Sequence, residues 1–236
     1  MPLLELEQHP YLASQVDDFT DRMKLSKYFS LIVGTFPIYA LTTSTPVEND
    51  GYEKRENWLL HAFIQYYYGS LGSSFWNLFS NAFNEEMPTT QGEAIALLDK
   101  YGFLITDVFK NACRKGYSPL DNDLINTELN HTIYEIIENS NNLKTIYFTS
   151  KTAKKRFCSI LGIRFLNEMH SFENILNRNY QLIVLPSPAG NGRTVRFFFD
   201  SFPLLKEERD KKLSGLSYAL DYRERYYSHY LPNFEI

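Results

Sequence analysis

Residues 66–76 gather groups that could act on a flat, charged ligand. Three consecutive tyrosines are followed by two glycines, three serines and the pair Phe75-Trp76. Glycine lets the backbone approach a ligand closely, and Ser73 or Ser74 can cap the helix that follows. Tyrosines beside free helix N–H groups could stack on an aromatic ring and hold an anion. This chemistry suits a nucleobase and its phosphate, while the alternative is a core helix preceded by an ordinary loop.

Two further groups of polar residues follow predicted strands. The apolar run 29–34 ends in a glycine and is followed directly by residues 35–37. The run 103–108 carries Asp107 near its end. A carboxylate among apolar neighbours is costly unless it is hydrogen-bonded, so Asp107 is either a structural or a site residue. Open α/β sheets bind ligands at the carboxyl ends of their strands, which makes both positions candidates for a site.

A fourth candidate follows the predicted strand 181–185. Residues 186–193 form a loop with two prolines, in which Ser187, Asn191 and Arg193 offer polar groups and a charge to phosphate. The alternative is a surface turn. The basic residues 154–156 could also meet phosphate, or they could form a solvated helix face.

The elements that must position these residues alternate along the chain. Strands are predicted at 29–34, 103–108, 144–149 and 181–185, and helices at 74–83, 92–101, 124–137 and 151–161. This alternation predicts a parallel sheet flanked by helices. We therefore expect four loops, at 35–37, 66–76, from Asp107 onward and at 186–193, to meet at one edge and form one cleft.

Length and composition set the class of protein. The 236 residues fit one domain, with residues 38–65 as a lid or insertion and 204–236 as a C-terminal helical segment. The formal net charge of −4 argues against a broad electrostatic grip on nucleic acid and leaves room for a local basic face. Cys113 and Cys158 fit no metal-ligand spacing. With no leader and no long apolar run, we expect a reduced, cytoplasmic protein without a membrane segment.

Taken in order, these segments resemble the uracil-DNA glycosylase superfamily. The resemblance is strongest to the branch of hypoxanthine- or uracil-acting glycosylases related to the mismatch-specific enzymes. It spans roughly residues 29–193, in the order of the family. The matching pieces are Gly34-Thr35-Phe36-Pro37, Tyr67-Tyr68 with Phe75-Trp76, and residues 102–108, 118–122, 147–153 and 185–189.

The resemblance implies a three-layer α/β/α domain around a central four-stranded parallel sheet. It also implies hydrolysis of the N-glycosidic bond of a deaminated base, uracil or hypoxanthine, in DNA repair. Such enzymes flip the base out of the duplex and hold it in a pocket. The reaction has an oxocarbenium-like sugar and a departing base anion, so it needs donors aimed at the anion and a positioned water. The expected partner is damaged or single-stranded DNA, bound by a monomer without metal or cofactor.

The resemblance also nominates site residues in three groups. The candidate catalytic residues are Ser73, Asn77 and Asp107; the base pocket would hold Thr35, Phe36, Pro37, Tyr68 and Phe75; and the DNA contacts would be Ser187, Pro188, Asn191 and Arg193.

This sequence departs from the family at several of these positions. Ser73 stands where the branch commonly carries an asparagine that handles the water or the sugar, and a hydroxyl cannot offer the paired donor and acceptor of an amide. Asn77, one turn later, could replace that amide or could be a surface or capping residue. Ile38 follows Pro37, and Pro186-Ser187 follow Leu185, so neither motif supplies the Asp or His of other branches.

These departures leave two other functions open. The first is a catalytically inactive protein that uses the same cleft to bind nucleic acid or a nucleotide-like ligand. The second is an interaction or inhibitor-type protein built on the same fold, which the acidic balance and the tyrosine-rich C-terminal segment suggest.

Overall fold

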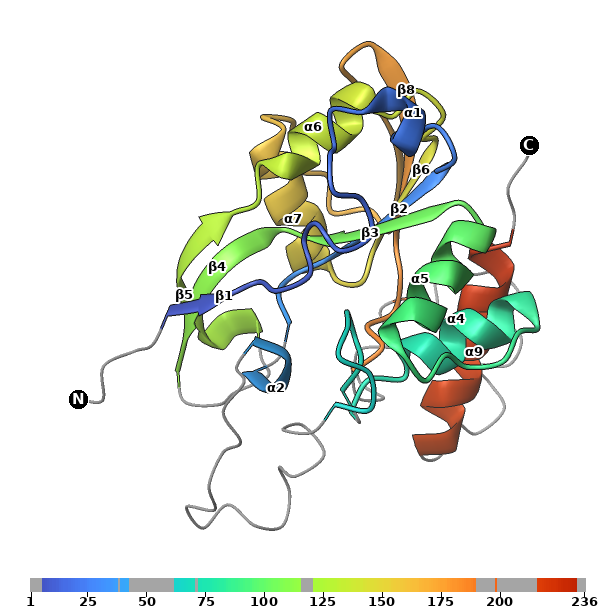
Figure 1. The fold of residues 1–236 in the computed structure, drawn as a ribbon. Coiled ribbons are helices and arrows are strands. Elements are labelled where there is room, and N and C mark those ends of the chain that lie inside the picture. The colour runs from blue at the N-terminus through green and yellow to red at the C-terminus, as the bar shows by residue number, and fades with distance from the viewer. Residues whose placement is uncertain are drawn as a thin grey trace.

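The computed structural model describes residues 6–37, 39–42, 62–70, 72–115, 121–189, 198 and 216–232 (Figure 1). Most of the predicted lid at 38–65, together with Asn191 and Arg193, lies outside these residues. The elements in chain order are β1 (Leu6–Gln8), α1 (Arg22–Leu25), β2 (Ser30–Gly34), α2 (Tyr39–Thr42), α4 (Phe75–Phe83), α5 (Gln91–Lys100), β3 (Phe103–Asp107), β4 (Phe109–Arg114), the 3-10 helix η1 (Asp121–Asp123), β5 (Leu124–Leu129), α6 (Thr132–Asn139), β6 (Thr145–Phe148), α7 (Lys151–Ile160), β7 (His170–Ile175), β8 (Arg178–Val184) and α9 (Leu216–Tyr230).

The larger sheet has five strands in the order β3-β2-β6-β8-β7. The first four strands run parallel to one another, and β7 pairs antiparallel with β8 at the edge. The predicted four-stranded parallel sheet is therefore right in part, because the sheet is mixed and has one more strand. The hairpin between β7 and β8 turns at Leu176 and Asn177, which both have positive φ. Leucine is an unusual residue for such a turn, so no typical turn dipeptide marks the hairpin.

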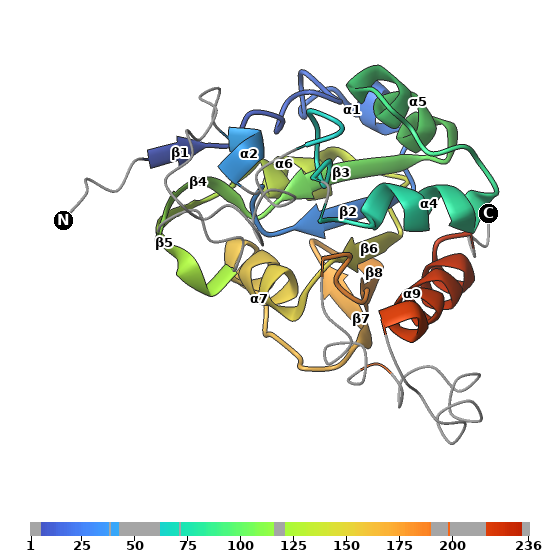
Figure 2. The same cartoon turned by 90° about the horizontal axis from the view of Figure 1, so that it is seen from below.

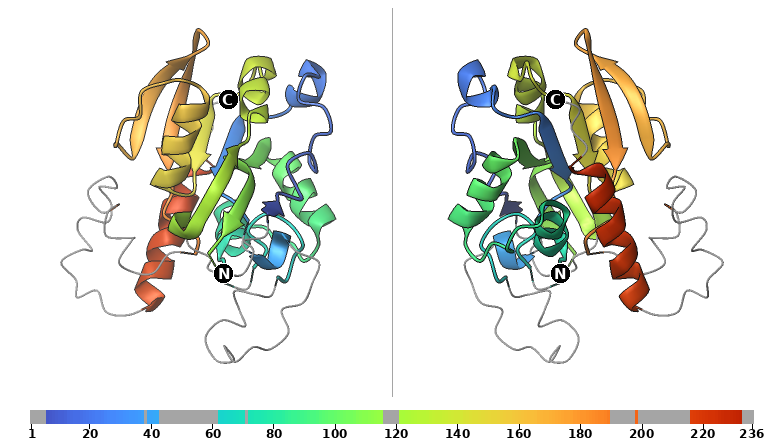
Figure 3. Two further views of the ribbon diagram at one scale, coloured as in Figure 1. Left: turned by 90° about the vertical axis from the view of Figure 1, so that its left-hand side faces the viewer. Right: turned by 90° about the vertical axis from the view of Figure 1, so that its right-hand side faces the viewer.

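Helices cover both faces of this sheet. Successive residues of a strand point to opposite faces. In β6, Phe148 packs against Phe157 of α7, with ring centroids 5.1 Å apart. Its neighbour Tyr147 donates a hydrogen bond of 2.7 Å to the carbonyl of Tyr230 in α9. The right-hand view of Figure 3 looks onto the side that α9 covers, and α4 packs beside α9 (Figures 1 and 2).

A second, three-stranded antiparallel sheet of order β1-β4-β5 adjoins the first. Val108 alone separates β3 from β4, so one stretch of chain contributes to both sheets. The prediction of a helix at 124–137 is wrong in its first half, because Leu124–Leu129 is strand β5 and α6 starts at Thr132. The apolar residues at 124, 125, 129, 133, 136 and 137 recur at helical spacing through β5 and α6, so the pattern did not separate the strand from the helix.

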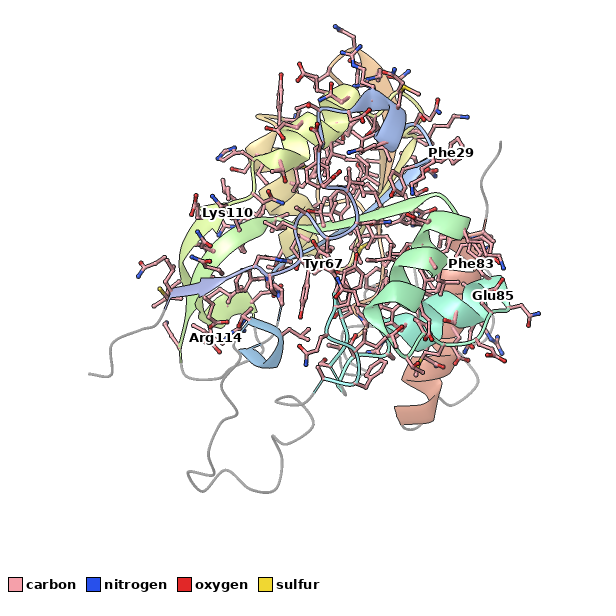
Figure 4. All side chains as sticks on the ribbon, viewed as in Figure 1. Phe29, Tyr67, Phe83, Glu85, Lys110 and Arg114 are labelled. Carbon is pink, nitrogen blue, oxygen red and sulfur yellow. The ribbon has the colours of Figure 1, made fainter. Side chains whose placement is uncertain are left out.

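Buried aromatic side chains fix the segment before α4. Tyr66, Tyr67, Phe75 and Trp76 are at most 1% exposed, and Tyr67 lies near the centre of the molecule (Figure 4). The indole Nε1–H of Trp76 donates a hydrogen bond of 2.8 Å to the carbonyl of Tyr67. This bond joins the loop of residues 66–70, here called the tyrosine loop, to the first turn of α4. None of the helices in the described part of the chain combines the length and apolar character that a membrane crossing requires.

Candidate functional site

The candidate site lies at the carboxyl ends of the parallel strands β2, β3 and β6. Their register places Gly34 opposite Asp107 and Val33 opposite Phe148. The next residue after β6 is Thr149, and its Oγ1 lies 2.9 Å from the hydroxyl of Tyr68. Three strands and the tyrosine loop therefore deliver polar groups to one edge of the sheet, as the alternation of elements predicted.

Gly34 makes room for two of these groups. A Cβ at this position would lie 1.9 Å from the hydroxyl oxygen of Tyr68 and 2.1 Å from Oδ1 of Asp107. Only a residue without a side chain lets both groups meet there. Tyr68 itself has a φ of 56°, which is uncommon for a residue other than glycine. Strain of this kind is concentrated at functional sites, where the surrounding structure enforces it.

Asp107 is held by a histidine that the sequence analysis did not nominate. His9 Nδ1 accepts the N–H of Tyr11 at 3.1 Å, so the ring proton sits on Nε2, which donates to Asp107 Oδ2 at 2.9 Å. The side chains of His9 and Asp107 are 0% and 4% exposed. The second oxygen, Oδ1, is buried and has no hydrogen-bond partner among the described residues. Native structures rarely leave such an atom unpaired, so it calls for a functional explanation.

A second carboxyl group, that of Asp121, reaches the same edge from η1. Thr35 Oγ1 donates to Asp121 Oδ2 at 2.9 Å, and the Thr35 oxygen also lies 3.3 Å from Ser150 Oγ. Asp121 is half-buried. Burial raises the pKa of its carboxyl and the charge of Asp107 adds to this, while the Thr35 hydrogen bond and Arg114 oppose the shift. Asp121 belongs to the segment 118–122 that resembles the family but was not among the predicted site residues, and no local pattern shows that it meets Thr35.

Tyr68 contributes an uncharged hydroxyl and an aromatic ring. Burial, with Asp107 as the second cause, raises the pKa of Tyr68 well above its ordinary value, so its hydroxyl stays protonated. The ring lies against Phe75, with centroids 4.6 Å apart at an angle of 30°. Phe75 is fully buried and packs against the ring of Tyr68.

The start of α4 is tied to the loop after β8. Both the N–H and the hydroxyl of Ser74 donate to the carbonyl of Pro188, at 3.1 and 2.8 Å. This brings Ser187, which is half-exposed, next to the tyrosine loop. Ser73 Oγ accepts the N–H of Phe75 at 3.3 Å. Asn77 is half-buried in the first turn of α4.

Arg114 contacts Phe36 and Pro37, which follow β2. Its Nη2 donates to the carbonyl of Pro37 at 2.6 Å, and its guanidinium lies 5.9 Å from the ring centre of Phe36. Glu7 pairs with Arg114 at 3.0 Å, and both side chains are 2% exposed. Figure 4 shows Arg114 on the side of the molecule where α2 lies. Phe36 is half-buried, and its ring centre lies 5.8 Å from that of His9.

The basic residues of α7 divide into two groups. Lys154 is 1% exposed and donates to the carbonyl of Glu168 and the hydroxyl of Ser171, so it does not reach a phosphate. Burial lowers the pKa of its ammonium group. Lys155 and Arg156 are exposed. Within the described ranges, no group of three His, Cys, Asp or Glu side chains could hold a metal ion.

Similarity to known proteins is found at the level of solved structures. No protein-family model matches the sequence, and no curated protein matches it. Among solved structures, the chain is similar to the solution NMR structure of a candidate uracil DNA glycosylase from Methanosarcina acetivorans. The sequences are 20% identical, the match covers 88% of this chain and 93% of that chain, and the TM-score is 0.43. At this level of similarity, function has to be argued from the residues of the site.

Proposed function

We propose that the protein is a DNA glycosylase that hydrolyses the N-glycosidic bond of a deaminated base, uracil or hypoxanthine. The observation that carries this proposal is the unpartnered Oδ1 of Asp107, buried beside the Tyr68 hydroxyl at Gly34. A carboxylate oxygen accepts hydrogen bonds. The attacking water and the ring N–H that uracil and hypoxanthine share are both suitable donors.

Aromatic residues around Asp107 suit a flat ring. Phe36 and Tyr68 are each half-buried. Tyr68 lies beside the Asp107 carboxylate at Gly34, and Phe36 lies against His9, which binds that carboxylate. A base rotated out of the DNA stack loses its neighbours, and stacking on such rings compensates for part of that loss. Thr35, Pro37 and Phe75 complete the proposed base site, with Phe75 acting through Tyr68.

The polar groups match the charges that develop in the reaction. Cleavage of the glycosidic bond places positive charge on the sugar and negative charge on the base. Carboxylates stabilise the sugar, and neutral hydroxyls can donate to the base. The hydroxyls of Thr149 and Tyr68 lie at this edge of the sheet and are hydrogen-bonded to each other, so one of their two protons remains for the base. The hydroxyl proton of Thr35 is given to Asp121.

The proposed DNA contacts flank the site. Ser187 and Pro188 are joined to the start of α4 through Ser74, and we extend the contact surface to the exposed Lys155 on α7. Asn191 and Arg193 remain proposed contacts from the same loop. Because the chain carries a net charge of −4, these local contacts should give binding that weakens steeply with salt.

One observation favours the alternative of a binding protein without turnover. The hydroxyl of Ser73 accepts the N–H of Phe75 and so takes part in the start of α4. It cannot supply the donor and acceptor of the asparagine that the resemblance leads one to expect there. Under this alternative the same edge would hold a base without cleaving its bond.

The test is incubation with single- and double-stranded oligonucleotides that carry one uracil or one hypoxanthine. Matched oligonucleotides with cytosine or adenine at that position serve as controls, and abasic sites are counted after alkaline cleavage. We expect strand cleavage with a deaminated base and none with the controls or with heat-inactivated protein. Salt-sensitive binding without cleavage would establish the alternative, and the absence of both would overturn the two proposals together.

A further inference from the structure

We infer that Asp121 is the catalytic general base of this site and takes the proton from the attacking water, while Asp107 is a positioning carboxylate. This assignment deepens the proposed function and rests on it. It adds a catalytic residue from η1, at a position inside the matching segment 118–122 to which the resemblance gave no role.

The contacts of Asp121 leave one of its oxygens free to bind water. Oδ2 accepts the hydroxyl of Thr35 at 2.9 Å, and the structure gives Oδ1 no partner within the described residues. Thr35 follows β2 directly and belongs to the proposed base site. The hydrogen bond therefore holds the Asp121 carboxylate beside the place where the sugar and base would lie.

Exposure separates the roles of the two carboxylates. A general base must return its proton to solvent after each turnover, so it needs a path to water. The side chain of Asp107 is 4% exposed and one of its oxygens is occupied by His9. Asp121 is half-buried, so part of its surface still reaches solvent. Of these two carboxylates, only that of Asp121 combines a fixed position with access to solvent.

The charged groups that face Asp121 are Asp107 at the end of β3 and Arg114 at the end of β4, while the hydroxyl of Tyr68 is neutral. Asp107 favours protonation of Asp121, and Arg114 opposes it. Burial raises the pKa of the Asp121 carboxyl, with Asp107 adding to the effect. A carboxylate of raised pKa accepts a proton more readily than an ordinary one while it is still ionised near neutral pH.

The step balances with water as the only co-reactant. The water oxygen forms a bond to C1′ of the sugar and gives one proton to Asp121. The bond between C1′ and the base nitrogen breaks, and its electron pair leaves with the base. The base anion then takes up a proton, and Asp121 releases its own to solvent.

The experiment compares Asp121→Asn with Asp123→Asn, a control in the same short helix. We expect Asp121→Asn to lower kcat for base release by about 100-fold or more. KM and the affinity for uracil-containing DNA should change by less than about threefold. In the native protein kcat should fall as pH drops through the raised pKa of Asp121, because the base must be ionised. This acid limb should disappear in Asp121→Asn and stay in Asp123→Asn.

The outcomes separate this inference from the proposed function. If the native protein releases no base, the proposed function fails and the inference falls with it. If the native protein releases base and Asp121→Asn does so equally fast, only the inference is overturned. Should Asp121→Asn fail to fold, Asp121→Glu decides. Reduced kcat with a shifted acid limb supports the assignment, and an unchanged pH profile overturns it.

Discussion

The buried carboxylates of Glu7 and Asp107 are paired to different extents. Oε1 of Glu7 accepts a hydrogen bond from Arg114 at 3.0 Å, and Oε2 accepts one from Thr42 at 2.6 Å. Among the residues that the structure describes, the two side-chain oxygens of Asp107 have one partner, His9. A fully paired buried carboxylate is typical of a structural role. The unpaired oxygen of Asp107 can still accept a hydrogen bond from a ligand. The difference in pairing therefore indicates a structural role for Glu7 and a binding role for Asp107.

Both carboxylates depend on the N-terminal segment. Glu7 is part of β1, and His9 follows that strand directly. The family resemblance begins near residue 29 and did not include either residue. Arg114, at the end of β4, binds the carbonyl of Pro37, and His9, directly after β1, binds Asp107. The small sheet therefore positions both residues of the candidate site.

The largest effect on stability should come from Glu7→Gln. This change leaves the buried guanidinium of Arg114 without its counter-ion, so the free energy of unfolding should fall by about 3–5 kcal/mol. Urea denaturation measures the difference. The control is Glu128→Gln, whose exposed carboxylate lies 3.6 Å from Lys110 and should contribute less than about 1 kcal/mol. Equal effects of the two changes would show that the Glu7 pair is not structural.

An intermediate effect is expected for His9→Phe. Phenylalanine keeps an aromatic ring near Tyr67, whose centroid is 5.0 Å away, but removes the donor to Asp107. Loss of that hydrogen bond should lower the free energy of unfolding by about 1–3 kcal/mol and also reduce base release. The exposed His131→Ala is the control. Adding Asp107→Asn to His9→Phe should restore part of the stability, and strict additivity of the two changes would contradict the pairing.

The smallest effect on stability should come from Asp107→Asn. The amide oxygen can still accept the hydrogen bond of His9, and no unpaired charge is left, so the free energy of unfolding should stay within about 1 kcal/mol of the native value. Base release should nevertheless fall by about 100-fold. Thermal melting and the oligonucleotide assay together check this. A loss of stability as large as that of Glu7→Gln would assign Asp107 to the architecture.

Local patterns predicted the parallel strands and several helix ends. The apolar runs before Gly34 and around Ile105 became β2 and β3, and the cluster ending at Phe148 became β6. The helix predicted at 92–101 corresponds to α5, and Gly102 after it has a φ of 67°. Of the predicted C-terminal helix, Leu216–Tyr230 is confirmed. Strand β5 was missed because its apolar residues continue the helical spacing of α6.

The sequence by itself determined which segments become buried strands and amphipathic helices, because apolar periodicity and helix caps act between neighbouring residues. It also placed Thr35, Tyr68 and Asp107 among the candidates for one edge. Only the tertiary structure decided that His9 holds Asp107 across 98 positions and that Asp121 binds Thr35 across 86. Such contacts follow from how the two sheets pack, and no pattern along the chain encodes them.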